Sequence, residues 1–340
     1  MTISPDHAPL IQPVRRSPTY LRVVVTTRCN LQCAYCHMEG DPHQSGTPHG
    51  LDAELLGRCL EVAAAAGMRK IKLLGGEPLL RRDLPELVAR LRQAAPEADL
   101  SIITAGVVPT EALDAVLGAG LDRVNVSIHG FLPAAMAIRY PNALRGWGRR
   151  QAFLERVMAW GRPLKLNYVL SGPQDEADLE ALLDWAAPLP LVVNVLDNLS
   201  TALGWRGVLR TLVRLRGEPS ERTRVEDPDS LTTMHLRWSD GLTVELKHEE
   251  LGRLGAFVAC AGCPVRAQCK EGICALRLTH RGNLQACMDR PDLAIPLADL
   301  VSDGGVGAGL EAWREFMGRL QGDEASAQVR GWGRAPEELR

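Results

Sequence analysis

Short apolar runs alternate with longer runs of helical periodicity through the first two-thirds of the chain. The runs typical of buried strands cover residues 21–26, 70–74, 100–103, 123–128, 164–170 and 191–196. Strand–helix repeats of this kind predict βαβ units and therefore an α/β fold around a parallel sheet. In such sheets the chemistry lies at the carboxyl ends of the strands, so the residues that follow these runs are the candidates for a site.

The alternation ends after residue 198. The pattern then predicts a helix over residues 203–216, a charged loop over 218–229, a β-hairpin of residues 235–238 and 242–246, and a last helix over 310–320. The tail that follows is polar, so we expect it to pack loosely.

Composition excludes several classes of function. The 340 residues carry a net charge of −2, with 46% hydrophobic and 24% charged residues, as in an ordinary globular protein. This balance favours neither a nucleic-acid-binding surface nor attachment to a membrane surface. Residues 1–17 lack the apolar segment of a secretory signal, and no run approaches the ~18 apolar residues of a membrane-spanning helix. We therefore expect a cytoplasmic protein with no nucleic-acid or membrane partner, while its oligomeric state stays open.

Cysteine is the residue type whose distribution is unusual. Of nine cysteines, three form the motif Cys29-x3-Cys33-x2-Cys36 directly after the first strand-like run, and five lie between residues 260 and 287. The remaining one, Cys59, lies in a predicted helix and is expected to be a buried core residue. An odd number in two groups is not a disulfide framework, and it indicates two metal centres in a reducing compartment.

Three thiolates on one short loop can hold three irons of a cubane iron–sulfur cluster. The fourth iron is then open to a small molecule, which the cluster can bind and reduce. The alternative is a zinc site with His37 as the fourth ligand, although zinc sites usually combine two separated cysteine pairs.

Further polar residues follow the next strand-like runs. Gly75 and Gly76 lack a Cβ and can let the backbone approach a ligand closely, and Glu77 beside them can accept a hydrogen bond from an ammonium group. Thr104 and Ser127 lie at the ends of the third and fourth runs, where such residues are also common as caps and turn formers.

The second cysteine group has the spacing Cys260-x2-Cys263-x5-Cys269-x4-Cys274-x12-Cys287. Four of these thiolates could ligate a second cubane cluster fully, and three would leave it open to substrate. Zinc is the alternative, because Cys260-x2-Cys263 is a zinc-compatible pair. At least one of the five is spare, with Cys269 and Cys274 as the first candidates, and a predicted β-hairpin connects Cys274 to Cys287.

The two motifs of the first half together resemble the signature of the radical S-adenosylmethionine (SAM) superfamily. The second cysteine group resembles the auxiliary-cluster (twitch/SPASM-like) region of some of its subfamilies. Within the superfamily, the chain most resembles the GTP 3′,8-cyclase family of molybdenum-cofactor biosynthesis, in segments that include Leu21-Arg22-Val23, Lys165-Leu166-Asn167 and Arg277-Leu278-Thr279. The resemblance implies a partial (β/α)6 TIM-like barrel over residues 18–200, a linker helix and β-hairpin over 201–257, a small C-terminal β-hairpin iron–sulfur domain over 258–325, and a tail over 326–340.

The resemblance also assigns roles to residues. A SAM-binding [4Fe-4S] cluster would be held by Cys29, Cys33 and Cys36, and an auxiliary [4Fe-4S] cluster by Cys260, Cys263, Cys287 and either Cys269 or Cys274. SAM would be contacted by Tyr35, Gly75, Gly76, Glu77, Thr104, Ser127 and Asn167. The basic residues that would surround the substrate are Arg22, Lys70, Lys72, Lys165 and Arg277. The candidates for a catalytic side chain are His129, Lys165 and Arg277. Alternatively, His129 is an uncharged residue that lines the site without taking part in the reaction.

Reductive cleavage of SAM would yield a 5′-deoxyadenosyl radical that abstracts hydrogen from a small substrate, with a flavodoxin or ferredoxin as the reducing partner. Basic side chains that converge from several strands suit an anionic substrate such as a nucleotide or nucleotide-sugar. Ala275 and Leu276 stand where the cyclase family carries two arginines, which favours a divergent relative in natural-product or cofactor biosynthesis. The alternatives are a GTP 3′,8-cyclase proper, a peptide-modifying SPASM-type maturase, and a non-catalytic metal-binding protein.

Overall fold

The computed structural model describes residues 18–31, 33, 36, 50–139, 146–198, 203–225, 227, 233–247, 263, 275–288 and 290–322. The first strands are β1 (Tyr20–Thr26), β2 (Lys70–Gly75), β3 (Asp99–Thr104), β4 (Arg123–Ser127), β5 (Leu164–Leu170) and β6 (Val192–Asp197). They pair in parallel in this order. The helices between them are α1 (Ala53–Ala65), α2 (Leu84–Ala94), α3 (Thr110–Gly118), α4 (Pro133–Arg139), α5 (Trp147–Trp160) and α6 (Glu176–Ala186). The predicted α/β fold is therefore confirmed.

Later strands continue the same sheet at both of its ends. Helix α7 (Gly204–Arg216) is followed by β7 (Glu221–Val225), β8 (Thr233–Arg237) and β9 (Thr243–Lys247), and β9 pairs in parallel with β6. Strands β10 (Leu276–Leu278), β11 (Leu284–Cys287) and β12 (Arg290–Ile295) precede helix α9 (Leu297–Gln321), and β10 pairs in parallel with β1. Within the described residues, the sheet order is β12-β11-β10-β1-β2-β3-β4-β5-β6-β9-β8-β7. Both predicted hairpins are present and extend this sheet, while the division of the chain into four regions stays a prediction.

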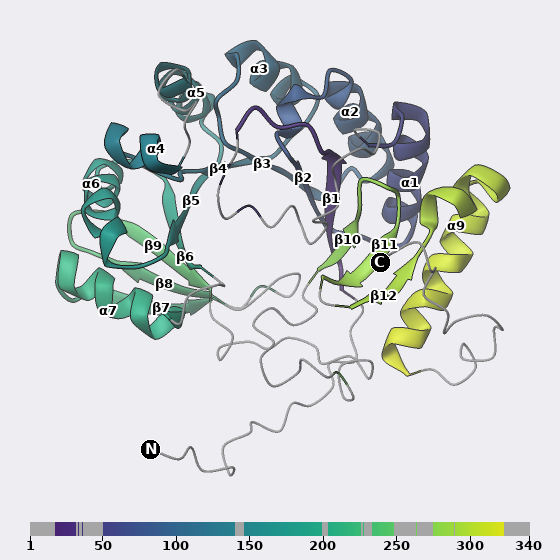
Figure 1. Ribbon diagram of the computed structural model, residues 1–340. Coiled ribbons are helices and arrows are strands. Elements are labelled where there is room, and N and C mark those ends of the chain that lie inside the picture. The colour runs from purple at the N-terminus through teal and green to yellow at the C-terminus, as the bar shows by residue number, and fades with distance from the viewer. Residues whose placement is uncertain are drawn as a thin grey trace, which may run out of the picture.

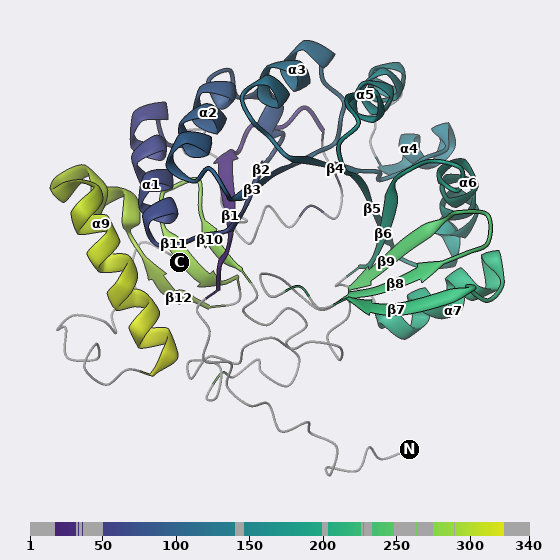
Figure 2. The ribbon, with the colours of Figure 1, turned by 180° about the vertical axis from the view of Figure 1, so that it is seen from behind.

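The sheet is curved into an arc with helices along its outer side (Figure 1). The view from behind shows the same arrangement, with α1, α2, α3, α5 and α6 outside the strands and α9 beside the β10–β12 end (Figure 2). No helix in the described ranges is both long and apolar enough to cross a membrane.

Alternation along the strands determines where the core lies, because successive side chains point to opposite faces of a sheet. Val23, Leu73 and Val124 point toward the helices and are fully buried in the hydrophobic core. The opposite face, called the inner face here, is polar on strand after strand. Its residues include Arg22, Lys72, Ser101, Asn125, Asn167, Asn194, Glu245 and Arg277. The inner face therefore differs from the helix-facing side by its polar and charged side chains.

Some elements differ from the prediction made from sequence. The predicted loop over residues 218–229 contains β7, whose mostly charged and exposed residues lack the apolar alternation of a half-buried strand. Helix α9 begins at Leu297 rather than near residue 310, because it continues through a kink at Gly305, which has a φ of 78°. The glycine-rich half of α9 packs closely against α1, since a Cβ on Gly309 would lie 3.0 Å from Val62 of α1. Strand β12 and helix α4 were not predicted.

Asp178 of α6 joins the segment after β4 to strand β5. Its buried carboxylate accepts hydrogen bonds from the backbone N–H groups of Phe131 and Leu132, at 2.9 and 2.6 Å, and from the Tyr168 hydroxyl at 2.9 Å. We expect Asp178→Ala to lower the free energy of unfolding by about 3 kcal/mol, because three donors lose their acceptor. Asp184→Ala on the same helix removes only an exposed ion pair and should cost less than about 1 kcal/mol. Urea unfolding followed by circular dichroism compares the two, and equal losses would contradict this account.

Candidate active site

The first cysteine motif leaves the carboxyl end of β1. None of the described cysteines is joined in a disulfide, and Cys29 and Cys36 are exposed while Cys33 is half-buried. The N–H of Leu31 donates to Cys29 Sγ at 3.4 Å, and the N–H of Cys36 donates to the carbonyl oxygen of Cys33 at 3.0 Å. Among the described residues, no three Cys, His, Asp or Glu side chains are grouped so that they could hold one metal ion. The donor set itself fits an iron–sulfur cluster, because three thiols outside disulfides lie on one short loop.

The backbone that leads into this loop lies directly against the glycines at the end of β2. Gly76 N–H donates to the carbonyl oxygen of Thr26 at 2.8 Å, and Glu77 N–H donates to that of Arg28 at 2.7 Å. A Cβ on Gly75 would lie 2.2 Å from the Thr26 oxygen, and a Cβ on Gly76 would lie 2.3 Å from the Arg28 oxygen. The glycines therefore permit contact between two protein segments, whereas the sequence had suggested a direct approach to a ligand.

Glu77 connects the ends of β2 and β3. Its side chain is 1% exposed and accepts hydrogen bonds from the Thr104 hydroxyl at 2.8 Å, the Ala105 N–H at 2.9 Å and the Leu79 N–H at 3.1 Å. Burial raises the pKa of the Glu77 carboxyl, and these hydrogen bonds oppose the shift. Thr104, predicted as a SAM contact, thus holds Glu77 in place in this structure.

Two other predicted SAM contacts lie on β4 and in the middle of β5. Ser127 is the last residue of β4, and Asn167 is its partner in register on β5. The Oδ1 of Asn167 accepts a hydrogen bond from Asn194 Nδ2 at 2.8 Å. His129 lies two residues beyond β4 and is half-buried. The predicted site residues outside the described ranges are Tyr35, Cys260, Cys269 and Cys274.

Two cysteines of the second group meet at Arg290. Cys287 ends β11 and is the register partner of Arg290 on β12. The guanidinium of Arg290 donates to the carboxylate of Asp292 at 2.7 and 2.5 Å. The pKa of Arg290 is raised first by that carboxylate and also by a hydrogen bond with the Cys263 side chain. Cys263 and Cys287 therefore both lie near Arg290.

Four of the predicted basic residues lie together on β10, β1 and β2. Arg22 is the register partner of both Lys72 and Arg277, and the last two are buried. Lys70 shares the inner face with Lys72, and each ammonium nitrogen lies 5.6 Å from the centroid of the Tyr20 ring. These residues occupy the first half and the middle of their strands, so they lie deeper in the arc than the cysteine loop.

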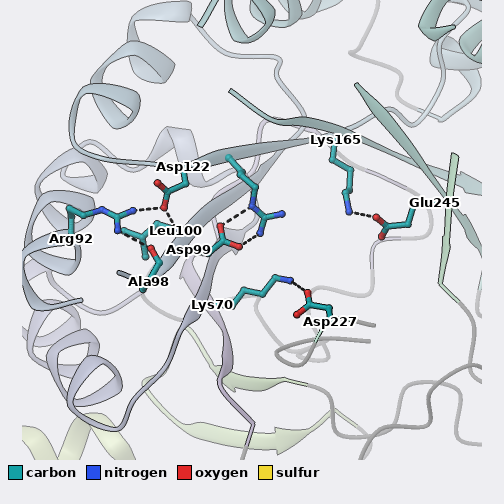
Figure 3. A network of polar contacts seen from close by, with 10 residues as sticks. Lys70, Arg92, Ala98, Asp99, Leu100, Asp122, Lys165, Asp227 and Glu245 are labelled. Atoms are coloured by element: carbon teal, nitrogen blue, oxygen red, sulfur yellow. Dashed lines mark hydrogen bonds and ion pairs between the residues drawn. The ribbon is translucent and has the colours of Figure 1, made fainter. Parts of the chain in front are cut away.

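Two of the predicted basic residues have acidic partners that the sequence analysis did not identify (Figure 3). Lys165 on β5 donates to the carboxylate of Glu245 on β9, and Lys70 donates to that of Asp227. His235 Nε2 of β8 lies 3.5 Å from the Glu245 carboxylate. The available signal for Glu245 was its position between two apolar residues of a predicted strand, which turns it to the inner face.

A family model described as the Radical SAM superfamily matches residues 23–186. A relative from Methanopyrus kandleri, named "Probable GTP 3',8-cyclase", is 31% identical over 290 residues, which are 82% of this chain and 84% of the relative. The chain belongs to the radical SAM superfamily. A relative of the same name from Metallosphaera sedula is 28% identical over 285 residues, or 83% of this chain and 84% of the relative. The crystal structure of Streptococcus suis SuiB bound to S-adenosylmethionine has a TM-score of 0.60 at 14% identity, covers 90% of this chain and 68% of that chain, and supports the fold.

This radical SAM protein is therefore an enzyme, and the predicted resemblance and fold class are confirmed. Radical SAM enzymes work with a [4Fe-4S] cluster and SAM, which are the cofactors that the two motifs predicted. They act on a substrate and need a reductant. The roles of the individual site residues stay predictions.

We expect Gly76→Ala to disturb cluster assembly. The new methyl group would lie 2.3 Å from the Arg28 carbonyl oxygen, so the segment that leads to Cys29 must move, at a cost of about 1–3 kcal/mol. The measurement is iron and sulfide per chain after anaerobic reconstitution, where the variant should hold less than the wild type. Gly118→Ala in α3 is the matched control, because its methyl group would meet nothing within 4 Å. Equal iron content in both variants would show that the contact does not position the loop.

Proposed function

We propose that this radical SAM enzyme abstracts hydrogen from a small anionic substrate, a nucleotide or nucleotide-sugar, that binds on the inner face of the sheet. It would be a divergent relative of the proteins named GTP 3′,8-cyclase that it resembles. The observation that carries the proposal is the row of Arg277, Arg22 and Lys72, which are in register on three adjacent strands. Guanidinium and ammonium groups side by side suit phosphate or carboxylate oxygens.

The SAM side of the site would be formed by the cysteine loop and Glu77. A cluster held by Cys29, Cys33 and Cys36 would supply one-electron reduction, which splits the sulfonium of SAM and releases a 5′-deoxyadenosyl radical. Glu77 would bind the SAM amine. Burial raises the pKa of the Glu77 carboxyl, and a neighbouring ammonium group would favour its ionised form.

The two sides are connected through the same strands. Arg22 precedes the cysteine loop in β1, and Lys72 precedes Gly75 in β2. An anionic group held by this pair would therefore lie within the arc, while SAM would lie at the carboxyl ends of the strands. The carbon that loses hydrogen would lie between them.

An auxiliary [4Fe-4S] cluster would be held by Cys263 and Cys287 together with Cys260 and either Cys269 or Cys274. Support comes from the position of Cys263 and Cys287 near Arg290. Strand β11, which ends at Cys287, pairs with β10, which carries Arg277. A cluster there would lie near the anionic end of the substrate, where it could anchor the substrate or accept an electron from the product radical.

Cys33→Ala tests SAM cleavage. We expect the wild type, reconstituted anaerobically and reduced with dithionite, to release 5′-deoxyadenosine from SAM, and Cys33→Ala to release none above background. Cys59→Ala is the control, because burial in the core raises the pKa of the Cys59 thiol to about 12 and keeps it a neutral thiol rather than a ligand. Chromatography coupled to mass spectrometry measures the product. Release of 5′-deoxyadenosine by Cys33→Ala at the wild-type rate would refute the proposed mechanism.

GTP 3′,8-cyclisation is the second candidate, favoured by the 31% identity to the Methanopyrus kandleri relative of that name. Adding GTP to the same assay tests it. A guanine nucleotide substituted at carbon 8 is expected if the protein is a cyclase proper. Release of 5′-deoxyadenosine without such a product would favour the divergent relative.

A further inference from the structure

The β6–β9 side of the inner face has hydrogen-bond acceptors where the β10–β2 side has cations. Asn194 on β6 is 3% exposed, and its Nδ2 donates to Asn167. Its Oδ1 has no hydrogen-bond partner in the described part of the chain. A buried amide oxygen of this kind costs stability unless a ligand or water donates to it.

Glu245 on β9 is the register partner of Asn194, so the two acceptors are neighbours on adjacent strands. Glu245 is 4% exposed, accepts from Lys165 and lies 3.5 Å from His235 Nε2. Lys165 is therefore held by a protein carboxylate, which competes with any substrate anion for its charge. Figure 3 shows the two side chains pointing toward each other.

A pocket lies on the strands beyond Glu245. A pocket on the inner face of β7, β8 and β9 is lined by residues that include His235 and Thr243. In register, His235 is the partner of Glu245, so the pocket includes the residue next to Glu245 on the neighbouring strand. The inner face thus has a group of cations on β10, β1 and β2 and a pair of hydrogen-bond acceptors on β6 and β9.

We propose that Asn194 and Glu245 bind an uncharged part of the substrate that carries two neighbouring N–H or O–H donors, either the amino–imino edge of a purine or the vicinal diol of a sugar. This inference rests on the proposed function, because the anionic end of the same molecule would be held by Arg22, Lys72 and Arg277. Two acceptors on adjacent strands match two adjacent donors, and the carboxylate makes one of the two hydrogen bonds charge-assisted. Glu245 is then a specificity-determining residue, and Lys165 positions its carboxylate.

The test separates the two sides with two probes on the reconstituted holoenzyme with SAM. Equilibrium dialysis measures the affinity for guanosine, which has the donors and no phosphate, and for inorganic tripolyphosphate, which has the charge and no donors. Glu245→Gln should weaken guanosine binding about tenfold, because a charged acceptor is lost. The same variant should strengthen tripolyphosphate binding about threefold, because Lys165 loses its competing partner.

Lys165→Gln removes the cation and keeps the Glu245 carboxylate, so tripolyphosphate binding should weaken by a larger factor than guanosine binding, which loses only the positioning of that carboxylate. Glu180→Gln, the same substitution at an exposed position of α6, should change neither affinity. Inosine lacks the 2-amino group and 2′,3′-dideoxyguanosine lacks the diol, so the nucleoside that loses affinity identifies the group bound at Asn194 and Glu245.

Failure of guanosine to bind the wild type would overturn the inference. A Glu245→Gln variant in which both affinities fall together would also overturn it, because general damage to the fold produces that result. The inference is likewise overturned if neither affinity changes. Formation of 5′-deoxyadenosine is measured on the same wild-type preparation. Its absence would overturn the proposed function, whereas its presence without opposite shifts of the two probes would overturn this inference alone.

Discussion

Two backbone hydrogen bonds hold the candidate active site together. They run from the N–H groups of Gly76 and Glu77 to the carbonyl oxygens of Thr26 and Arg28, and they exist only because no Cβ stands between the two segments. Through them the segment that carries the cysteines is attached to the end of β2. The Glu77 carboxylate continues the connection to β3 through the Thr104 hydroxyl. The ends of β1, β2 and β3 are therefore connected. A change at either glycine would move the thiols relative to Glu77, the carboxyl proposed to bind SAM.

The second constraint is the alternation that makes the inner face polar. Parallel strands usually bury both faces, which leads to continuous apolar runs. Here one face packs on the helices, and the other carries Arg22, Lys72, Asn125, Asn194 and Glu245. The strand groups at the two ends of the sheet enlarge this face in different ways. The β10–β12 end adds Arg277 and Cys287, whereas the β9–β7 end adds Glu245, His235 and Arg237.

Much of the fold could be predicted because each of its central strands buries apolar residues against the helices, and these residues form short runs that the local pattern reveals. Strand β7 could not, since its side chains are charged and exposed at the edge of the sheet. The cysteine and glycine motifs could be placed at strand ends from their order along the chain. The ion pairs of Lys165 with Glu245 and of Lys70 with Asp227 join residues 80 and 157 positions apart, so only the folded chain brings them together. For the same reason the acidic partners of Lys165 and Lys70 could not be predicted from the sequence.

The central claim is that the cysteine loop and the Gly75-Gly76-Glu77 segment form one site in which SAM meets a cluster with an open iron. Electron paramagnetic resonance of the anaerobically reduced enzyme, before and after addition of SAM, tests it most directly. Subtracting the spectrum of Cys33→Ala removes the contribution of any second cluster. We expect a difference signal whose g values change when SAM is added, because SAM would become a ligand of the open iron. A difference signal that SAM leaves unchanged, or no difference signal at all, would contradict it.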